Sequence, residues 1–424
     1  MAPSTKSHDP YAALRVPNFR RYIAALFTLT LALQIQGTVV GWQVYDLTRD
    51  PLALGLVGLA EALPAISMSL FSGHVADTHD RRRIALGALV VLVMCSIALW
   101  LLAHQAPLNV TLTMHRRVNA IYGVIAISGV ARAFLQPARQ ALSAELVPRA
   151  LFTNSVTWRS GSWQMAAVLG PALGGVLYAI GGTTLGYITD AALMTLATGL
   201  MLAVRHRSPI RVAQSVPVFE SITGGVRFVF GEPMLLSALT LDLFSVLFGG
   251  ATALLPVFAA DILRVGPSGL GILRAAPAVG AVVMSAALTR WPPFNNTGRS
   301  LLMAVTGFGA CMIGFGLSTV FGVSLVLLAL SGAFDAVSVV IRSVMLQART
   351  PEGLLGRVSA VNQIFIGSSN EIGAFESGMS AKLLGTVPSV VLGGMATLGV
   401  VALVAWRNPA LRRLRTLHPE LKAA

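Results

Sequence analysis

The sequence carries few charged residues, few acidic ones in particular, and almost no cysteine. Of its 424 residues, 11% are charged, against about 25% in a typical soluble protein. A soluble chain of this length would form about two or three domains with charged surfaces, and so few charges cannot cover them. The two cysteines, Cys95 and Cys311, lie inside apolar stretches, which excludes a disulfide framework and predicts buried, inert thiols. These shortages exclude an ordinary soluble protein.

The chain is rich in long apolar segments instead. Hydrophobic residues make up 55% of the sequence, and about twelve membrane helices of ~20 residues would use ~240 residues, close to that total. A window of about 19 residues finds twelve such segments, several of them interrupted by Gly or Pro. They lie at 22–45, 52–74, 84–103, 119–142, 154–180, 183–204, 233–258, 267–289, 300–319, 322–347, 358–381 and 386–406. The sequence therefore predicts an all-α polytopic membrane protein with twelve transmembrane helices.

The basic residues predict how these helices are oriented. The chain has 31 Lys and Arg against 17 Asp and Glu, a net charge of +14 that would suggest nucleic acid in a soluble protein. Most of the basic residues fall in loops on one side, and the opposite loops keep few: Arg49, Arg116, Arg117, Arg264 and Lys382. Because basic loops stay in the cytoplasm, we expect a multi-pass protein of the cytoplasmic (inner) membrane with both termini cytoplasmic.

A long connection on the predicted cytoplasmic side divides the chain into halves. Residues 205–232 are predicted to link an N-terminal six-helix bundle, 1–204, to a C-terminal six-helix bundle with a cytoplasmic tail, 233–424. Within this linker, Val218 to Phe230 fits either a short amphipathic helix on the membrane surface or a plain solvated chain.

Short matching stretches in the same order indicate that the two halves are repeats. Gly58–Pro64 in the second segment matches Gly271–Pro277 in the eighth, and Ser128–Ala133 in the fourth matches Ser331–Ala336 in the tenth. Each match is short, but their common order supports a duplication of six helices. The expected fold is therefore two pseudo-symmetric six-helix bundles.

The repeat also aligns buried charges of opposite sign. Glu61 corresponds to Arg274, and Arg132 corresponds to Asp335, so each half has one acid and one base on its second and fourth helices. A lone charge at such a depth costs several kcal/mol, so partners are expected. We predict ion pairs between Glu61 and Arg132 and between Arg274 and Asp335. The same offset aligns two further basic residues, Arg139 and Arg342.

The loop after the second segment carries a glycine, an aspartate four residues on and a basic cluster. These residues are Gly73, Asp77, Arg81, Arg82 and Arg83. The pattern resembles the signature loop of the major facilitator superfamily. Gly73 would let helices approach closely, and Asp77 would accept hydrogen bonds from a helix N-terminus and pair with arginine. We expect a latch for one gate state; the alternative is a basic loop that only fixes topology.

The fifth segment contains small residues around a proline, namely Gly170, Pro171, Gly174 and Gly175. This stretch resembles the end of a motif associated with proton-driven exporters of that superfamily. Small residues allow close helix packing, and a proline makes a bend possible. The motif implies export; the alternative is a helix that only packs.

Longer stretches look like one branch of the superfamily, the enterobactin-exporter-like branch of drug and metabolite exporters. They are Trp42–Thr48, Gly58–Pro64, Arg132–Ala138 and Gly356–Asn362, and the resemblance extends from Leu14 to the last segment. It implies the twelve-helix fold and a central cavity lined by the first, fourth, seventh and tenth helices. The substrate does not follow, because fold does not fix function.

Acidic residues inside the apolar segments are candidates for proton coupling. Asp242 and Asp335 fall on helices that the resemblance places around the cavity, so we predict that they carry protons or contact a cation. A permanent ion pair is the alternative for Asp335. Three further buried acids are Asp190, for which we expect a local hydrogen bond, and Glu371 and Glu376, whose roles stay open.

Four residues are candidates for a substrate pocket beside Asp242: Gln34, Gln36, Phe244 and Phe248. Phe244 and Phe248 share a helix face at i,i+4 spacing, which also suits plain packing.

Together these features predict a secondary active transporter. We expect export of a small amphipathic organic compound, such as a drug, siderophore or related metabolite, by proton antiport and alternating access. The alternatives are proton-coupled uptake of a nutrient and a non-transporting membrane sensor or assembly protein. An enzyme is not expected, since no nucleophile and base stand out.

The expected energy source is the proton gradient, with no cofactor. The sequence has no Walker loop for ATP, and the lone histidines His74 and His79 do not suggest a metal site. The expected partners are a small-molecule substrate, protons and the lipid bilayer, with no nucleic acid, and the expected state is a monomer.

Overall fold

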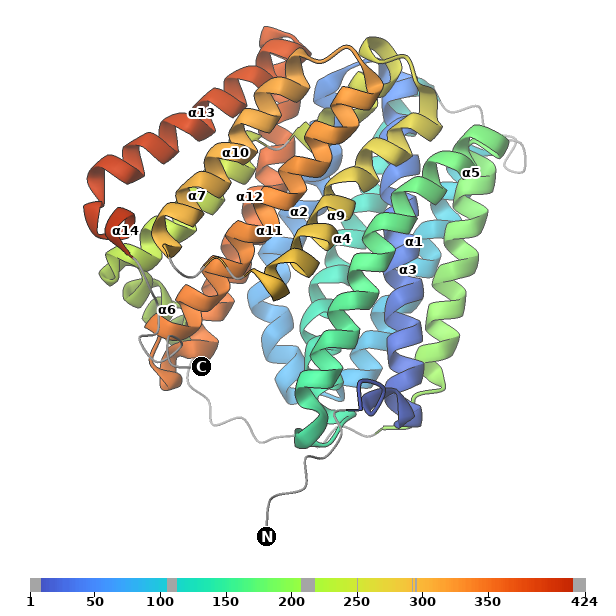
Figure 1. Ribbon diagram of the computed structural model, residues 1–424. Helices are drawn as coiled ribbons and strands as arrows, with labels where there is room; N and C mark the ends of the chain where they lie inside the picture. Colours follow the sequence, from blue (N-terminus) through green and yellow to red (C-terminus); the bar gives the residue numbers. More distant parts are fainter. Residues whose placement is uncertain are drawn as a thin grey trace.

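A computed structural model describes residues 9–104, 113–206, 218–249, 251–291, 293 and 296–414. Within these ranges the side chains of residues 69, 70, 74, 77, 218–222, 352, 360, 364 and 368 are not described. The described chain is helical almost throughout, and its long helices form two groups (Figure 1).

Each group of helices comes from one half of the chain. The N-terminal group comprises α1 (Pro17–Thr48), α2 (Pro51–Thr78), α3 (Arg81–Ala103), α4 (Met114–Glu145) and α5 (Phe152–Leu202). The C-terminal group comprises α7 (Pro233–Gly249), α8 (Leu255–Val257), α9 (Gly266–Arg290), α10 (Thr297–Leu317), α11 (Phe321–Arg349), α12 (Leu355–Leu384) and α13 (Thr386–Arg407). Shorter elements are η1 (Ala13–Arg15), η3 (Arg149–Leu151), α6 (Val218–Gly231), η4 (Ala251–Leu254), η5 (Phe258–Ile262), η6 (Glu352–Leu354) and α14 (Pro409–Arg413).

Ten helical stretches of the described chain are long and apolar enough to cross a membrane. The fifth and sixth predicted segments form one element, α5, whose two legs meet where Gly181 and Gly182 leave helical geometry. Gly182 has a φ of 60°, which glycine adopts without a Cβ clash. The eleventh predicted segment, α12, is not among the ten and carries Glu371, Glu376 and Lys382. Counting both legs of α5 gives eleven spans, and the twelfth, along α12, stays a prediction.

Aspartates set the starts of two helices. The carboxylate of Asp50 accepts a hydrogen bond from the Leu52 amide at 3.0 Å, which caps α2. Asp80 accepts from the amides of Arg82, at 2.9 Å, and Arg83, at 3.3 Å. Asp80, in the predicted gate loop, is therefore the residue that fixes where α3 begins.

The seventh predicted segment is interrupted. After α7 ends at Gly249, the chain continues through the 3-10 turn η4, the short helix α8 and the π-helical turn η5. Pro256 in α8 has no backbone N–H to donate, which is one cause of the break. The π turn ends the segment and carries Asp261, which takes part in the contacts described below.

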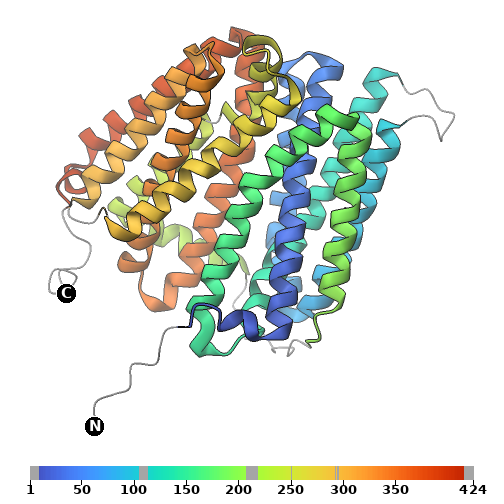
Figure 2. The same cartoon turned by 45° about the vertical axis from the view of Figure 1, so that its right-hand side comes forward.

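The two groups of helices lie side by side and are tilted against each other (Figures 1 and 2). We refer to the end of the molecule that carries Asp50 and Asp261 as the Asp50 end, and to the end that carries Arg81 and Arg349 as the Arg81 end. In both views the ribbons of the two groups approach each other at the Asp50 end and diverge toward the Arg81 end.

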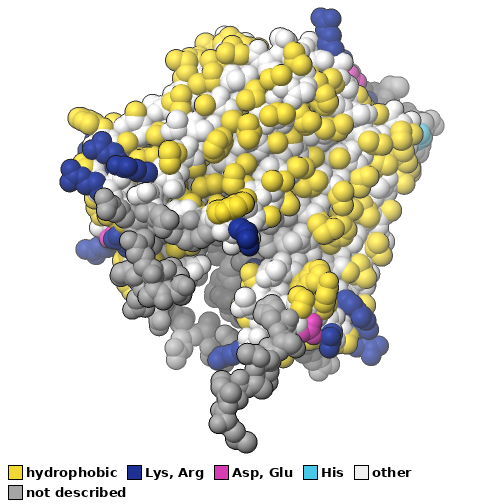
Figure 3. Space-filling view, viewed as in Figure 1, with side chains coloured by type: hydrophobic (Ala, Val, Ile, Leu, Met, Phe, Trp, Pro, Cys, Tyr) yellow, Lys and Arg dark blue, Asp and Glu magenta, His cyan; other side chains and the backbone are white. Residues whose placement is uncertain are grey.

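The surface seen in Figure 3 is apolar over most of its area, and basic side chains gather near its ends. Large hydrophobic side chains such as Val283, Val326 and Trp406 are exposed. An apolar belt of this kind suits the hydrocarbon core of a bilayer. With the ten candidate spans, it makes the chain a multi-pass membrane protein.

The short helix α6 occupies the second part of the predicted linker, whose residues 207–217 lie outside the described ones. Methyl groups on Gly224 and Gly225 would lie 3.3 Å and 2.9 Å from atoms of Arg357 in α12, so α6 packs on the C-terminal group. The sequence allowed either a helix or a solvated chain here, and the structure has a helix. Its contact with the membrane surface stays a prediction.

Candidate functional site

The two halves contact each other along two helix–helix interfaces, which we call seams. One seam is formed by α2 and α12. Lys382 forms an ion pair with Asp50 at the Asp50 end. Further along, a methyl group on Gly55 would lie 3.2 Å from the Cα of Gly378. The two glycines allow the backbones to touch, so the halves meet here with almost no side chain between them.

The other seam joins α5 to α9, and the predicted motif of the fifth segment forms it. A methyl group on Gly175 would lie 2.9 Å from the Cα of Gly271 and closer still to the carbonyl oxygen of Pro267. Gly170 and Gly174 face α1 instead, where methyl groups would lie 3.2 Å and 3.1 Å from its backbone. The close packing that the sequence predicts is therefore present, both inside the N-terminal half and across the seam, and its link to export stays a prediction.

Polar contacts close the Asp50 end between the halves. The Tyr45 hydroxyl donates to the carboxylate of Asp261, and Arg49 lies 3.4 Å from the same carboxylate. The apolar core continues across the halves beneath these contacts, where Val44 and Phe258 belong to one buried cluster. Every ion pair that joins the halves within the described ranges lies at this end. Asp261 was not predicted, because a single acid after an apolar segment gives no pattern.

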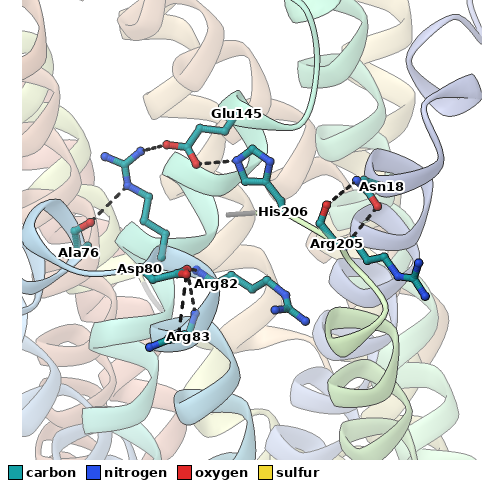
Figure 4. Close-up of polar contacts among 9 residues, drawn as sticks. Asn18, Ala76, Asp80, Arg82, Arg83, Glu145, Arg205 and His206 are labelled. Atoms are coloured by element: carbon teal, nitrogen blue, oxygen red, sulfur yellow. Dashed lines mark hydrogen bonds and ion pairs between the residues drawn. The ribbon is translucent and has the colours of Figure 1, made fainter. Parts of the chain in front are cut away.

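At the Arg81 end, polar contacts tie the helices of the N-terminal half to one another (Figure 4). Arg81 forms an ion pair with Glu145 at the end of α4, and a ring nitrogen of His206 lies 3.2 Å from the same carboxylate. Arg82 donates to the carbonyl oxygen of Leu202 at 2.7 Å. These contacts join α3, α4 and α5 into one unit.

The predicted latch of the gate loop is described only in part. The side chain of Asp77 lies outside the described residues, so its role stays a prediction. The close helix approach predicted at Gly73 is wrong for this conformation, since a methyl group there would meet nothing within 4 Å. The physical reason is the divergence of the two halves at the Arg81 end (Figure 1). Arg83 lies 4.0 Å from the carboxylate of Asp80 and is exposed.

Near the middle of the α2–α12 seam, an arginine lies between acids from both halves. Arg132 of α4 forms an ion pair with Glu61 of α2, the contact that the repeat predicts. Glu371 of α12 adds an electrostatic attraction to Arg132 from the other half. A carboxylate oxygen of Glu371 would lie 3.7 Å from a methyl group on Gly58, which places it against α2. Glu61 is thus the ion-pair partner of Arg132, and the carboxylate of Glu371 lies against α2 without an ion pair to another described residue.

The predicted ion pair between Arg274 and Asp335 is wrong. Arg274 reaches across to the N-terminal half and donates to the carbonyl oxygen of Gly37 in α1 at 2.7 Å. Asp335 faces the other side of α11, where it lines a small cavity with Ser245 and Phe308 of α7 and α10. The pair does not form because the face of α11 that packs against α9 carries Gly332, not Asp335.

Asp242 has a partner that the sequence did not predict. Its carboxylate forms an ion pair with Arg342 of α11, and both side chains are buried, with 8% and 7% of their surfaces exposed. The repeat aligns Arg342 with Arg139, but no pattern in the sequence indicated that Arg342 pairs with Asp242. Phe244 and Phe248 stack on each other, with centroids 5.7 Å apart and planes 12° apart. Their role in a pocket stays a prediction.

Gln36 does not lie beside Asp242, so that placement is wrong. It is fully buried in the N-terminal half, where its amide donates to Asp190 at 2.9 Å and to Ser96 at 3.3 Å. The reason is again the helix face, because α1 turns Gln36 toward α3 and α5. Asp190 thereby has the local hydrogen bond that we expected. The neighbouring Gln34 packs against Gly170 of α5.

Within the described part of the chain, no three His, Cys, Asp or Glu side chains cluster in a way that could hold a metal ion. Glu376 of α12 makes no hydrogen bond or ion pair with another described residue. The geometry therefore presents carboxylates, arginines and amides inside an apolar bundle, which suits binding and translocation of a solute.

Two curated proteins are similar to this chain in sequence. The enterobactin exporter EntS of Shigella flexneri is 28% identical over 414 residues, 96% of each chain. EntS of Escherichia coli O127:H6 is 28% identical over 412 residues, again 96% of each chain.

Solved structures of transporters share the fold. A bacterial homologue of the iron transporter ferroportin, in an inward-facing state, has a TM-score of 0.71 at 16% identity, with 94% of this chain and 99% of that chain covered. A POT family transporter in complex with 5-aminolevulinic acid has a TM-score of 0.71 at 11% identity, with 93% and 96% covered. At these identities the likeness shows the fold alone.

A family model described as transmembrane secretion effector matches residues 8–419. One family of transporters therefore covers nearly the whole chain, in agreement with its helical architecture and with its similarity to exporters. The chain belongs to the transmembrane secretion effector family of the major facilitator superfamily.

Proposed function

We propose that this transporter exports a small amphipathic organic molecule, such as a drug, siderophore or related metabolite, in exchange for protons. The observation that carries the proposal is the likeness to enterobactin exporters over 96% of both chains. The proposal covers a class of compound, since 28% identity does not carry one substrate to another protein.

Export would proceed by rocking of the two halves. We place the protein in the cytoplasmic membrane with both termini, and hence the Arg81 end, in the cytoplasm, because the basic loops lie at that end. The Asp50 end would open when the contacts of Asp50 with Lys382 and of Arg49 with Asp261 break. Exposed ion pairs of this kind contribute about 0–1 kcal/mol each, so the glycine seams and the shared apolar core supply most of the closure.

Asp335 is the first candidate for the proton carrier. It lines its small cavity at membrane depth, and no hydrogen bond or ion pair joins it to another described residue. An unpaired charge there costs several kcal/mol, and protonation removes that charge. Asp242 is the second candidate. Because Arg342 now neutralises its carboxylate, Asp242 would take up a proton only in conformations in which Arg342 has moved away.

The proton gradient would be the energy source, and no cofactor would be needed. A monomer would suffice, because both seams lie within one chain. Proton-coupled uptake of a nutrient is the second candidate function, and a non-transporting sensor or assembly protein is the third. Uptake predicts that substrate accumulates in energised cells, whereas the third predicts no flux of any compound.

Efflux from preloaded cells tests the direction. Cells that produce the wild-type protein or Asp335→Asn are loaded with lipophilic cations or catechol siderophores, energised, and followed by mass spectrometry of the medium. We expect wild-type cells to lose at least one compound faster than cells without the protein, and an uncoupler to abolish the difference. Accumulation inside the cells would instead identify uptake, and equal rates across the panel would refute export of this class.

A further inference from the structure

Two arginines of the N-terminal half lie together, and no acid among the described side chains pairs with either. Arg139 is on α4 and Arg159 is on α5, and Arg159 donates to the hydroxyl of Ser143 at 2.7 Å. The hydroxyl of the buried Tyr22 in α1 donates to the carbonyl oxygen of Arg139 at 2.7 Å. Three helices therefore converge here, and because Ser143 lies one turn beyond Arg139 on α4, its contact brings the guanidinium of Arg159 alongside Arg139.

Several other arginines of this protein pair with an acid, although Arg274 does not. Arg132, Arg81 and Arg342 each pair with a carboxylate, namely those of Glu61, Glu145 and Asp242. Arg139 is the repeat counterpart of Arg342. In the C-terminal half that position is neutralised by Asp242, whereas no acid among the described side chains pairs with Arg139 or Arg159.

The pair lies toward the ends of its helices at the Arg81 end, where the neighbouring Trp158 donates to the carbonyl oxygen of Pro10. Arg139 is six residues before the end of α4 and Arg159 seven residues after the start of α5, or about 9–10.5 Å from the helix ends at 1.5 Å per residue. Two like charges that lie close together repel each other. An anion between them would offset that repulsion.

The surroundings of the pair suit water and a polar ligand. Close to the pair in the sequence, Gln136 and Gln140 on α4 and Thr157 and Ser160 on α5 are exposed. Exposed amides and hydroxyls are favourable beside water. Trp163, one turn beyond Arg159 on the same helix, is 54% exposed and adds an apolar surface.

We infer that Arg139 and Arg159 form a binding site for an oxyanion, a carboxylate, phosphate or ionised catechol group, which takes the place of the missing acid. Guanidinium groups bind such anions through paired N–H donors. The anion could belong to the transported substrate, in which case the inference rests on the proposed function and makes the substrate an anion, or to a lipid headgroup.

A matched pair of probes tests the site in the full chain. The purified protein is placed in phosphatidylcholine nanodiscs and titrated with 2,3-dihydroxybenzoate, an anion, and with 2,3-dihydroxybenzamide, its neutral analogue, by calorimetry. The variants are Arg139→Gln, Arg159→Gln and Arg159→Lys. Arg290→Gln, an exposed arginine at the end of α9, is the control with the same change in charge. Thermal unfolding of each variant shows that it is folded.

We expect the wild-type protein and Arg290→Gln to bind the anion at least tenfold more tightly than the amide. Either Gln variant would lose that preference at unchanged affinity for the amide, and Arg159→Lys would keep part of it. A second arm measures phosphatidylglycerol retained by each protein in native mass spectrometry, and retention that depends on both arginines would identify the anion as a headgroup. Absence of arginine-dependent anion binding in both arms overturns the inference.

Efflux measured in parallel separates this inference from the proposed function. Efflux that survives in both Gln variants, without anion preference in the wild type, refutes the site and leaves export standing. Arginine-dependent anion binding without any efflux refutes export and leaves the site standing.

Discussion

A single methyl group on the α5–α9 seam should open the Asp50 end. In Gly175→Ala the added carbon would lie 2.9 Å from the Cα of Gly271, whereas ordinary contacts begin near 3.4 Å. The two helices must separate by at least about 0.5 Å, and more to clear the carbonyl oxygen of Pro267. Overpacking of this kind costs about 1–3 kcal/mol, so at about 2 kcal/mol the population closed at this end falls roughly 30-fold relative to the open one.

Spin labels on the two halves measure this shift. Thr113 and Val320 are exposed, lie at the Asp50 end on opposite halves, and can be changed to Cys after Cys95 and Cys311 are replaced by Ala. Double electron–electron resonance should then show a longer distance gaining population in Gly175→Ala.

Gly87→Ala is the matched control, because a methyl group at Gly87 would meet nothing within 4 Å. We expect its distance distribution to equal that of the parent protein. A distribution in Gly175→Ala that is also unchanged, at unchanged thermal stability, would refute the seam as the contact that closes this end.

Two further predictions concern ion pairs. Asp242→Asn leaves Arg342 buried without a counter-charge, which should cost about 3–5 kcal/mol and lower the unfolding temperature, whereas Asp242→Asn with Arg342→Gln should recover part of that loss; a double variant less stable than the single one would contradict the pair. Lys382→Ala breaks an exposed pair with Asp50 and should lower stability by no more than about 1 kcal/mol, an effect that 1 M salt removes; a larger, salt-insensitive loss would show that Lys382 has another role.

The fold follows from composition and pattern, because only a polytopic bundle can use so many apolar residues. The Glu61–Arg132 pair could also be predicted, since both residues lie on neighbouring helices of one repeat unit. The pair of Arg274 with Asp335 failed because hydropathy does not fix how each helix is rotated about its axis. For the same reason the sequence could not show that Gln36 binds Asp190 in the interior.

The contacts between the halves were the hardest to predict. Asp261 contacts Tyr45 and Arg49 from the π turn that ends the interrupted seventh segment. No sequence pattern predicted that turn. The glycines were easier, because the small residues of the fifth segment already indicated close packing. Their partner helix, α9, became evident only from the arrangement of the two halves.

Proton movement in inside-out vesicles tests the central claim, export coupled to protons, most directly. Energised vesicles that contain the wild-type protein receive lipophilic cations and catechol siderophores one by one, and a fluorescent dye reports the internal pH. Vesicles without the protein and vesicles with Asp242→Asn and Asp335→Asn together are the controls. The account predicts that at least one compound releases protons from wild-type vesicles and from neither control. Proton release that persists in the double variant would contradict the role of these acids, and silence across the panel would contradict proton antiport.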